Sequence, residues 1–251
     1  MSVSDISIRR VVAQKASGLL AGRLRDMILS GEFLSGELLP PERDLVADSG
    51  LSRGSVREAL KILETEGLVE IRSGRSGGAR VTVPKRTALV RSTELFVRAN
   101  GVPLDSLLDC RIAVEPMLAL LAARNRSAAE LEKLRKLHRE FEASVGDVKR
   151  YRQVNLAWHL AVAIASRNEP LMALMEAIST PLLEATGYEA VTTPETRQQA
   201  VRAHAAVIEA IARQDESAAS RAMEKHLSSY SAILRAELAT EATKGQAPSK
   251  I

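Results

Sequence analysis

The sequence predicts a mainly α-helical protein made of two parts, and three observations support this. Aromatic residues make up only 3% of the 251 residues, whereas Ala and Leu are abundant, a composition that favours helices over strands. Two helix-length segments and a Gly-rich hairpin occupy residues 36–83, and only helical periodicity follows from Thr87 onward. We therefore expect an N-terminal domain of helices and one hairpin and a C-terminal helical bundle, joined by a linker at residues 84–86.

Proline, serine and glycine mark the helix ends in the N-terminal part. A first helix is expected from about Val12 to Ser30. Pro40-Pro41 opens a second helix, where the missing N–H of proline costs no hydrogen bond, and Gly50 closes it. Ser52 is a natural N-cap for a third helix, and Gly67 ends that helix.

A hairpin is expected after the third helix, with strands over Leu68–Arg72 and Ala79–Val83. The six residues between the strands include three glycines, which suits a hairpin tip that lies close to another backbone. A helix, a tight turn, a capped helix and a Gly-rich hairpin form a winged helix-turn-helix, which reads DNA. This domain is expected over residues 12–83, after a flexible arm at residues 1–11.

The third helix has one apolar face and one basic face. Arg53 and Arg57 lie one turn apart near its start, so both can face the major groove, where arginine matches the acceptors of guanine. Two arginines alone most often mark a solvated helix face, but this supersecondary context favours DNA contact. Neighbouring serines, an arginine of the second helix and the hairpin tip can reach phosphates, bases or the minor groove. The candidate DNA-contacting residues are Arg43, Ser52, Arg53, Ser55, Arg57, Gly74 and Arg75.

Seven helices with short connections are expected in the C-terminal part, which predicts an antiparallel bundle over residues 87–240. Pro181 is expected to kink or split the fifth of these helices, and residues 241–251 are expected to form a disordered tail. The expected helices cover residues 87–100, 104–124, 128–144, 147–166, 169–186, 195–213 and 215–240.

Four histidines fall on the apolar stripes of these helices. Polar groups that face the inside of a bundle are costly unless they are paired. Three imidazoles that meet there would form a site for zinc, nickel, copper or iron, although each histidine alone is more often a hydrogen-bonded core residue. His138 lies on a stripe just as His159, His204 and His226 do, so periodicity alone leaves the choice of ligands open.

Charge and cysteine content narrow the class of protein. The net charge is +4, of which residues 1–86 carry +3, so DNA affinity has to come from the placement of charge. Cys110 is the only cysteine, which excludes an internal disulfide and suits a buried apolar position. No apolar run is long enough to span a membrane and no leader peptide is recognisable, so a cytoplasmic protein without a membrane partner is expected.

The N-terminal part resembles the signature of GntR-family bacterial transcription regulators. The strings that carry the resemblance are Leu39-Pro-Pro-Glu-Arg-Asp-Leu45, Leu51-Ser-Arg53, Val56-Arg-Glu-Ala-Leu60 and Glu66-Gly-Leu68. The resemblance implies a homodimer that binds a short palindromic operator on double-stranded DNA. The DNA-contacting positions that it implies match Arg43, Ser52, Arg53, Ser55, Arg57 and the wing around Gly74.

Residues 87–240 resemble the FCD ligand-binding domain of the FadR subfamily of these regulators. Asn155-Leu-Ala-Trp-His159 is similar to the D-x3-H element of that domain, and His204 and His226 match its second and third histidines. The resemblance implies that Asn155 and the three histidines bind a divalent transition metal such as zinc or nickel, beside a small carboxylate effector. Asparagine replaces the commoner aspartate, which either weakens metal retention or favours an anionic effector that completes the coordination shell.

Arg111 matches an arginine that often lies near the effector pocket in this family. One hypothesis is that its guanidinium binds the effector carboxylate. A salt bridge to Glu115, one helical turn further on, is the alternative.

The expected function is a ligand-responsive transcription regulator, a repressor that senses an organic or sugar acid in a metal-containing pocket. A regulator that senses the metal itself is the alternative. An enzyme is not expected, because neither a general base nor a nucleophile motif accompanies the histidines, and an enzyme needs no DNA-binding domain.

Overall fold

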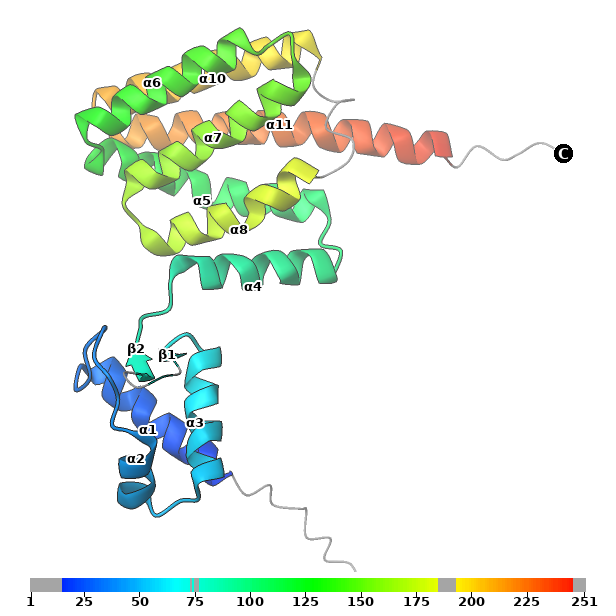
Figure 1. Ribbon diagram of the computed structural model, residues 1–251. Coiled ribbons are helices and arrows are strands. Elements are labelled where there is room, and N and C mark those ends of the chain that lie inside the picture. The colour runs from blue at the N-terminus through cyan, green and yellow to red at the C-terminus, as the bar shows by residue number, and fades with distance from the viewer. Residues whose placement is uncertain (1–14, 73, 75–76, 185–192, 246–251) are drawn as a thin grey trace, which may run out of the picture. The chain divides into compact units, whose positions relative to one another are not determined.

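The computed structural model describes residues 15–72, 74, 77–184 and 193–245, and the chain divides into two compact units between Ala88 and Leu89. Helices dominate both units (Figure 1), which confirms the predicted fold class. The expected arm at residues 1–11 lies outside the described residues. The expected linker at residues 84–86 is short in the structure, because a helix already begins at Arg86.

In its described residues, the N-terminal unit consists of three helices and a two-stranded antiparallel sheet. Helices α1 and α2 both pack against α3. Gly31 and Gly50 end α1 and α2 in the left-handed conformation that glycine adopts without a steric penalty. The elements are α1 (Ala16–Ser30), α2 (Glu42–Ser49), α3 (Arg53–Thr65), β1 (Val69–Arg72) and β2 (Gly78–Val81).

The apolar face of α3 forms the centre of this unit. Val56, Leu60 and Leu63 are buried, as their spacing of three to four residues predicts, and Ala59 joins them. Each large apolar side chain buried in this way stabilises the fold by about 1.5–3 kcal/mol. The opposite face of α3 is left to solvent with its arginines.

The hairpin pairs Val69 with Val81 and Arg72 with Gly78. A third segment, which the sequence suggested only as a connection, lies along the free edge of β2. There Leu38 forms an isolated bridge with Arg80, and the Leu39 N–H donates to the Ala79 carbonyl over 2.8 Å. This extra pairing holds the start of α2 beside the hairpin.

The C-terminal unit is an all-helical bundle in the part of the chain that the structure describes (Figure 1). Helix α11 packs against α5 and α10, α5 also packs against α7, and α6 packs against α7 and α10. None of the described helices is both long and apolar enough to cross a membrane. The elements are α4 (Arg86–Ala99), α5 (Leu104–Asn125), α6 (Ala128–Ala143), α7 (Val148–Ser166), α8 (Glu169–Glu184), α10 (Pro194–Ala212) and α11 (Glu216–Gly245).

One expectation about a helix end is wrong. Helix α11 runs to Gly245, so residues 241–245 are helical and not part of a disordered tail, since Ala, Glu and Lys continue a helix well. Pro181 does not split α8, which continues to Glu184, so a kink at Pro181 is the part of that expectation that stays a prediction. A second proline, Pro116, lies inside α5. The helical pattern of the sequence predicted one continuous helix there, and α5 is continuous.

Candidate functional site

The candidate DNA-binding face begins at the N-terminus of α3. Ser52 caps the helix, because its Oγ accepts a hydrogen bond from the Ser55 N–H over 3.2 Å. The two serine hydroxyls also lie within hydrogen-bonding distance of each other, at 3.0 Å. Arg53 and Arg57 are exposed, as a helix that enters the major groove requires. The structure thus places these four predicted residues on one end of one helix.

Two arginines of this face, Arg57 and Arg43, have acidic partners within the protein. Arg57 Nε donates to Glu42 Oε2 of α2 over 2.9 Å, with Arg57 71% exposed and Glu42 43% exposed. Arg43 Nε donates to its neighbour Asp44 over 2.9 Å. Exposed pairs of this kind contribute about 0–1 kcal/mol to stability, so a phosphate or a base can replace the acidic partner. The sequence gave no signal for the Glu42–Arg57 pair, which joins two helices.

The wing carries the remaining DNA-contacting candidates. Gly74 lies at the exposed hairpin tip with a φ of 118°, a conformation that a side chain would strain. Arg75 lies outside the described residues.

The bundle brings three of its histidines together. His159 of α7, His204 of α10 and His226 of α11 each offer one ring nitrogen within 4.8 Å of the others. His204 is fully buried, His159 is 1% exposed and His226 is 9% exposed. The Nε2 atoms of His204 and His226 are 3.1 Å apart. His138, which the sequence pattern could not distinguish from them, lies on α6 and is not part of this group.

A buried carboxylate holds one of these rings in place. Glu115 Oε2 of α5 lies 2.5 Å from His159 Nδ1, and its other oxygen accepts a bond from Arg111 Nε. His159 therefore donates its Nδ1–H to the carboxylate and turns Nε2 toward the other histidines, the arrangement usual for a histidine that binds a metal. Glu115 was predicted only as a partner of Arg111. Its link to His159 depends on the packing of α5 against α7.

Among the described residues, no group accepts or donates a hydrogen bond at His204 Nδ1, and this ring is oriented by aromatic rings instead. Its imidazole lies between Trp158 and Phe141, with ring centroids 3.8 Å and 4.5 Å away and nearly parallel planes. Tyr151 stacks on the outer side of Phe141 with a centroid distance of 4.4 Å. This stack fixes the plane of the His204 ring so that its Nε2 points toward His226.

Burial and charge set the protonation state of the group. Burial alone would raise the pKa of Glu115, but the charges of Arg111 and His159 outweigh it and lower that pKa to about 2. Burial, together with the charges of His159 and Arg111, lowers the pKa of His226 to about 3. The pKa values of His159 and His204 are lowered too, chiefly by burial. At neutral pH the group is a carboxylate and three neutral imidazoles, the form that binds a metal.

Two buried atoms show that these residues suit a metal ion. Among the described residues, neither His159 Nε2 nor Asn155 Oδ1 has a hydrogen-bond partner. Buried polar atoms without a partner are costly, and a cation between them would satisfy both. The 3.1 Å between His204 and His226 is also close to the spacing of neighbouring ligands around an ion with metal–nitrogen bonds of about 2.1 Å.

Arg111 is the predicted effector-binding residue, and the structure shows its alternative partner. It forms a buried ion pair with Glu115, with the two side chains 8% and 2% exposed. Arg111 also lines two small interior cavities of about 30 and 20 Å³, as does Asn155. An effector contact by Arg111 stays a prediction.

Two protein-family models match the chain, one for each unit. The model for bacterial regulatory proteins of the gntR family matches residues 17–78, and that for the FCD domain matches residues 106–229. The transcriptional repressor NanR of Enterobacter sp. is 30% identical over 238 residues, which cover 92% of this chain and 90% of that protein. The chain belongs to the gntR family. It is a transcription regulator with a DNA-binding helix-turn-helix domain and an FCD effector domain, not an enzyme.

Two further similarities extend over most of this gntR-family chain. The transcriptional regulator LutR of Bacillus subtilis is 31% identical over 219 residues, covering 83% of this chain and 96% of LutR. The solved structure of a Streptococcus agalactiae GntR protein aligns with a TM-score of 0.57 at 26% identity. The alignment covers 86% of this chain and 99% of the chain in that structure.

Proposed function

We propose that this gntR-family regulator is a repressor of the FadR subfamily that binds a palindromic operator as a homodimer. Its FCD domain senses a small carboxylate with the help of a divalent metal such as zinc or nickel. The relatives named NanR, which are transcriptional repressors, support the direction of regulation. As a regulator of this kind acts where the chromosome lies, we expect it in the cytoplasm.

The observation that carries the proposal is the buried group of His159, His204 and His226. These three residues and Asn155 would hold the ion, with Glu115 keeping the His159 ring in position. A bound divalent ion supplies a positive charge and an open coordination position for an oxygen ligand. The protein supplies the buried, oriented donors.

The charges around the group favour an anion. All four proposed ligands are neutral, and the charge of Glu115 is already balanced by Arg111. A divalent ion held there keeps its full charge in a buried site, where uncompensated charge is costly. A carboxylate effector would compensate that charge. The aspartate expected from the resemblance at position 155 would have supplied part of this compensation.

The effector can change operator affinity only if it binds the two forms of the regulator differently. Its binding energy then shifts the equilibrium between a DNA-binding form and a released form. On the DNA side, we propose that Arg43, Ser52, Arg53, Ser55 and Arg57 contact the operator together with the wing around Gly74 and Arg75. The exposed N-terminus of α3 supports the proposed contacts of Ser52, Arg53, Ser55 and Arg57.

A zinc titration of the chelator-treated full-length protein tests the metal site. We expect zinc to raise the melting temperature, because a ligand at 100 times its Kd adds about 2.7 kcal/mol to stability. His204→Ala is expected to abolish this shift. His138→Ala is the matched control, since it removes a half-buried histidine outside the group. Equal shifts in both variants would contradict the proposed site.

The second step separates the acid sensor from a metal sensor. In the acid sensor, zinc stays bound, and a carboxylate changes the affinity for an operator selected from random DNA. In the metal sensor, zinc alone changes that affinity and no carboxylate has a further effect. The metal sensor is worth testing because the three histidines that would hold the ion are buried and lie close together.

A further inference from the structure

Helix α4 packs on the effector bundle through one buried side chain. Of its fourteen residues, all of which the structure describes, Val97 alone is buried. It belongs to an apolar cluster with Leu107 of α5 and with Met172 and Met175 of α8. Figure 1 shows α4 along one side of the bundle. Because a helix of this length is marginal in water by itself, we expect α4 to need more burial than this.

The side of α4 that points away from Val97 is apolar as well. Leu89, Leu95 and Phe96 are 47%, 68% and 60% exposed. At about 3.6 residues per turn, they share one stripe of the helix surface, about 120° wide, with three small residues. The outward stripe consists of Ala88, Leu89, Ser92, Leu95, Phe96 and Ala99, and the charged residues of α4 lie outside it. Apolar surface on opposite sides is typical of a helix that is buried on both.

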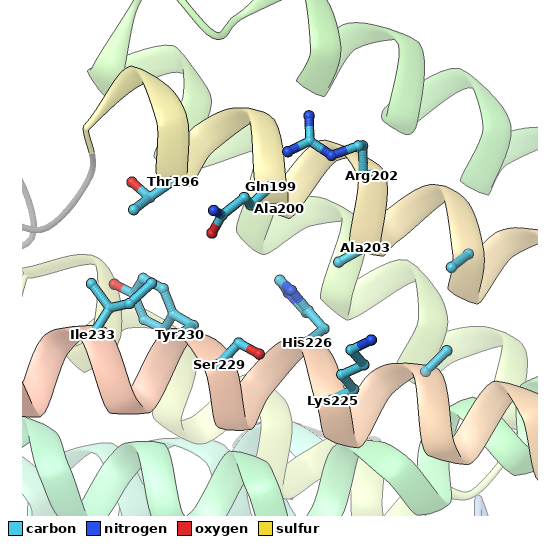
Figure 2. Close-up of a pocket in the computed structure, with 12 residues that line it drawn as sticks. Thr196, Gln199, Ala200, Arg202, Ala203, Lys225, His226, Ser229, Tyr230 and Ile233 are labelled. Carbon is cyan, nitrogen blue, oxygen red and sulfur yellow. The ribbon is translucent and has the colours of Figure 1, made fainter.

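A groove between α10 and α11 is another open surface of the bundle. It has a volume of about 480 Å³ and adjoins the buried histidines, because His226 lines it (Figure 2). Gln199, Lys225 and Ser229 also line the groove and offer an amide, an ammonium and a hydroxyl group that water can solvate. The side chains of the outward stripe offer only the hydroxyl of Ser92. The stripe is therefore the surface with more to gain from a protein partner.

The area of the stripe fits an interface at the small end of the usual range. Leu89, Leu95 and Phe96 together expose roughly 300 Å² of apolar surface. Two such stripes would bury roughly 600 Å², whereas a standard interface buries about 900 Å² of apolar surface. A pair of copies joined here is thus expected to dissociate at micromolar concentration and not to be obligate.

The order of side chains along the stripe suits a second copy of the same helix. In an antiparallel pair with a two-fold axis at Ser92, Leu89 lies opposite the partner's Leu95. In the same pair, Phe96 lies opposite the partner's Ala88, so that a large side chain meets a small one. The small Ser92 at the centre lets the two helices approach closely.

The place of α4 in the chain also favours a second copy over another partner. Residues 82–85 connect β2 to α4 and can span at most about 14 Å. The first residues of two antiparallel helices of this length lie about 20 Å apart. DNA-binding units attached at these two points can reach half-sites about 34 Å apart, which is one turn of DNA.

From these observations we infer that two copies of the chain associate through the outward stripe of α4, as an antiparallel helix pair centred on Ser92. The inference rests on the proposed function, which includes a homodimer, and it adds the surface that forms that dimer. Association at α4 links the two DNA-binding units, so binding of one half-site raises the effective concentration of the second unit at the other.

A charge on the stripe is expected to separate the copies. Phe96→Lys in the full-length protein should raise the dimer dissociation constant at least tenfold, as measured by sedimentation equilibrium. Leu29→Lys makes a matched change at a leucine of α1 that is 69% exposed, and it is expected to stay within about twofold of wild type. Phe96→Lys should also weaken binding to a selected palindromic operator at least tenfold and leave binding to a single half-site unchanged.

A cysteine at the proposed axis tests the register without removing an apolar side chain. Cys110, the only cysteine, is first replaced by serine. In that background, Ser92→Cys is expected to form a disulfide between two copies in the presence of oxidised glutathione. The Cα atoms of closely packed helices come within the roughly 4.4–6.8 Å that a disulfide needs. Thr87→Cys, an exposed position of α4 outside the stripe, is the control and is expected to cross-link little.

The possible failures are distinguishable. If wild type is a dimer, Phe96→Lys is equally tight and Ser92→Cys does not cross-link, the copies meet elsewhere. The inference is then wrong, yet the homodimer stands. If wild type stays a monomer at all concentrations and binds a palindrome as one copy, the inference fails together with the homodimer of the proposed function. Another part of the chain or a different protein would then cover the stripe.

Discussion

The two units of the molecule each contain a predicted site arginine paired with a glutamate, in opposite surroundings. In the DNA-binding unit, Arg57 is 71% exposed and its partner Glu42 is 43% exposed. In the effector unit, Arg111 is 8% exposed and Glu115 is 2% exposed. The two pairs have the same chemistry but differ in their access to water.

This difference determines what each pair can do. Water and salt screen the exposed pair, so it contributes little to stability and can exchange its partner for DNA. The buried pair has lost its hydration, so removing either charge leaves the other uncompensated. The exposed arginine is thus available for recognition, while the buried one fixes the carboxylate that orients His159.

The largest expected effect comes from breaking the buried pair. Glu115→Ala leaves the Arg111 charge buried without its partner, and we expect a loss of about 3–5 kcal/mol in the free energy of unfolding. Urea unfolding followed by circular dichroism measures it. Glu42→Ala, which breaks the exposed pair, is the control and is expected to cost at most about 1 kcal/mol. Similar losses of stability in the two variants would show that the buried pair and the exposed pair do not differ as expected.

Removing the exposed arginine is expected to affect DNA binding and not folding. Arg57→Ala is expected to weaken operator binding by about 1–3 kcal/mol and relax base preference at one position. Binding to a selected operator and to its single-base variants measures both quantities. Arg139→Ala, which removes another exposed arginine, on α6 of the effector unit, serves as the control. A uniform loss across all DNA sequences would make Arg57 a phosphate contact.

Acid is expected to lower the stability of the effector unit through its buried histidines. The pKa of His226 is about 3 in the folded protein and near 6.5 when unfolded, so only the unfolded chain takes up a proton between these values. The contribution of His226 to the stability of the metal-free protein is therefore complete above about pH 6.5. As the pH is lowered, it falls by up to about 1.4 kcal/mol per pH unit. Unfolding of wild type and His226→Asn at pH 7 and pH 5.5 measures the slope. The same slope in both proteins would show that His226 does not titrate this way.

The smallest expected effect concerns the cap of α3. Ser52→Ala removes the acceptor for the Ser55 N–H and is expected to cost about 1 kcal/mol of stability. Ser52→Gly is expected to cost only a few tenths of a kcal/mol of stability. If operator affinity drops far more than stability in Ser52→Ala, the hydroxyl also contacts DNA.

The DNA-binding unit could be predicted nearly completely from the sequence. Ser52, Arg53, Ser55 and Arg57 lie within six consecutive positions, so the geometry of a single helix places them together. Even there, the pairing of Leu38 with Arg80 and of Glu42 with Arg57 was missed, because both join segments distant along the chain.

The effector site was less predictable for a physical reason. Helical periodicity tells which residues face inward but not which helices meet, and by that criterion His138 was equal to His159, His204 and His226. The sequence by itself determined the helices, the winged helix-turn-helix and the inward direction of the histidines. Packing of α5, α7, α10 and α11 decided that three histidines meet, that Glu115 holds His159, and that a groove adjoins them. Such contacts join residues from separate helices, and only the fit of whole helix surfaces determines them.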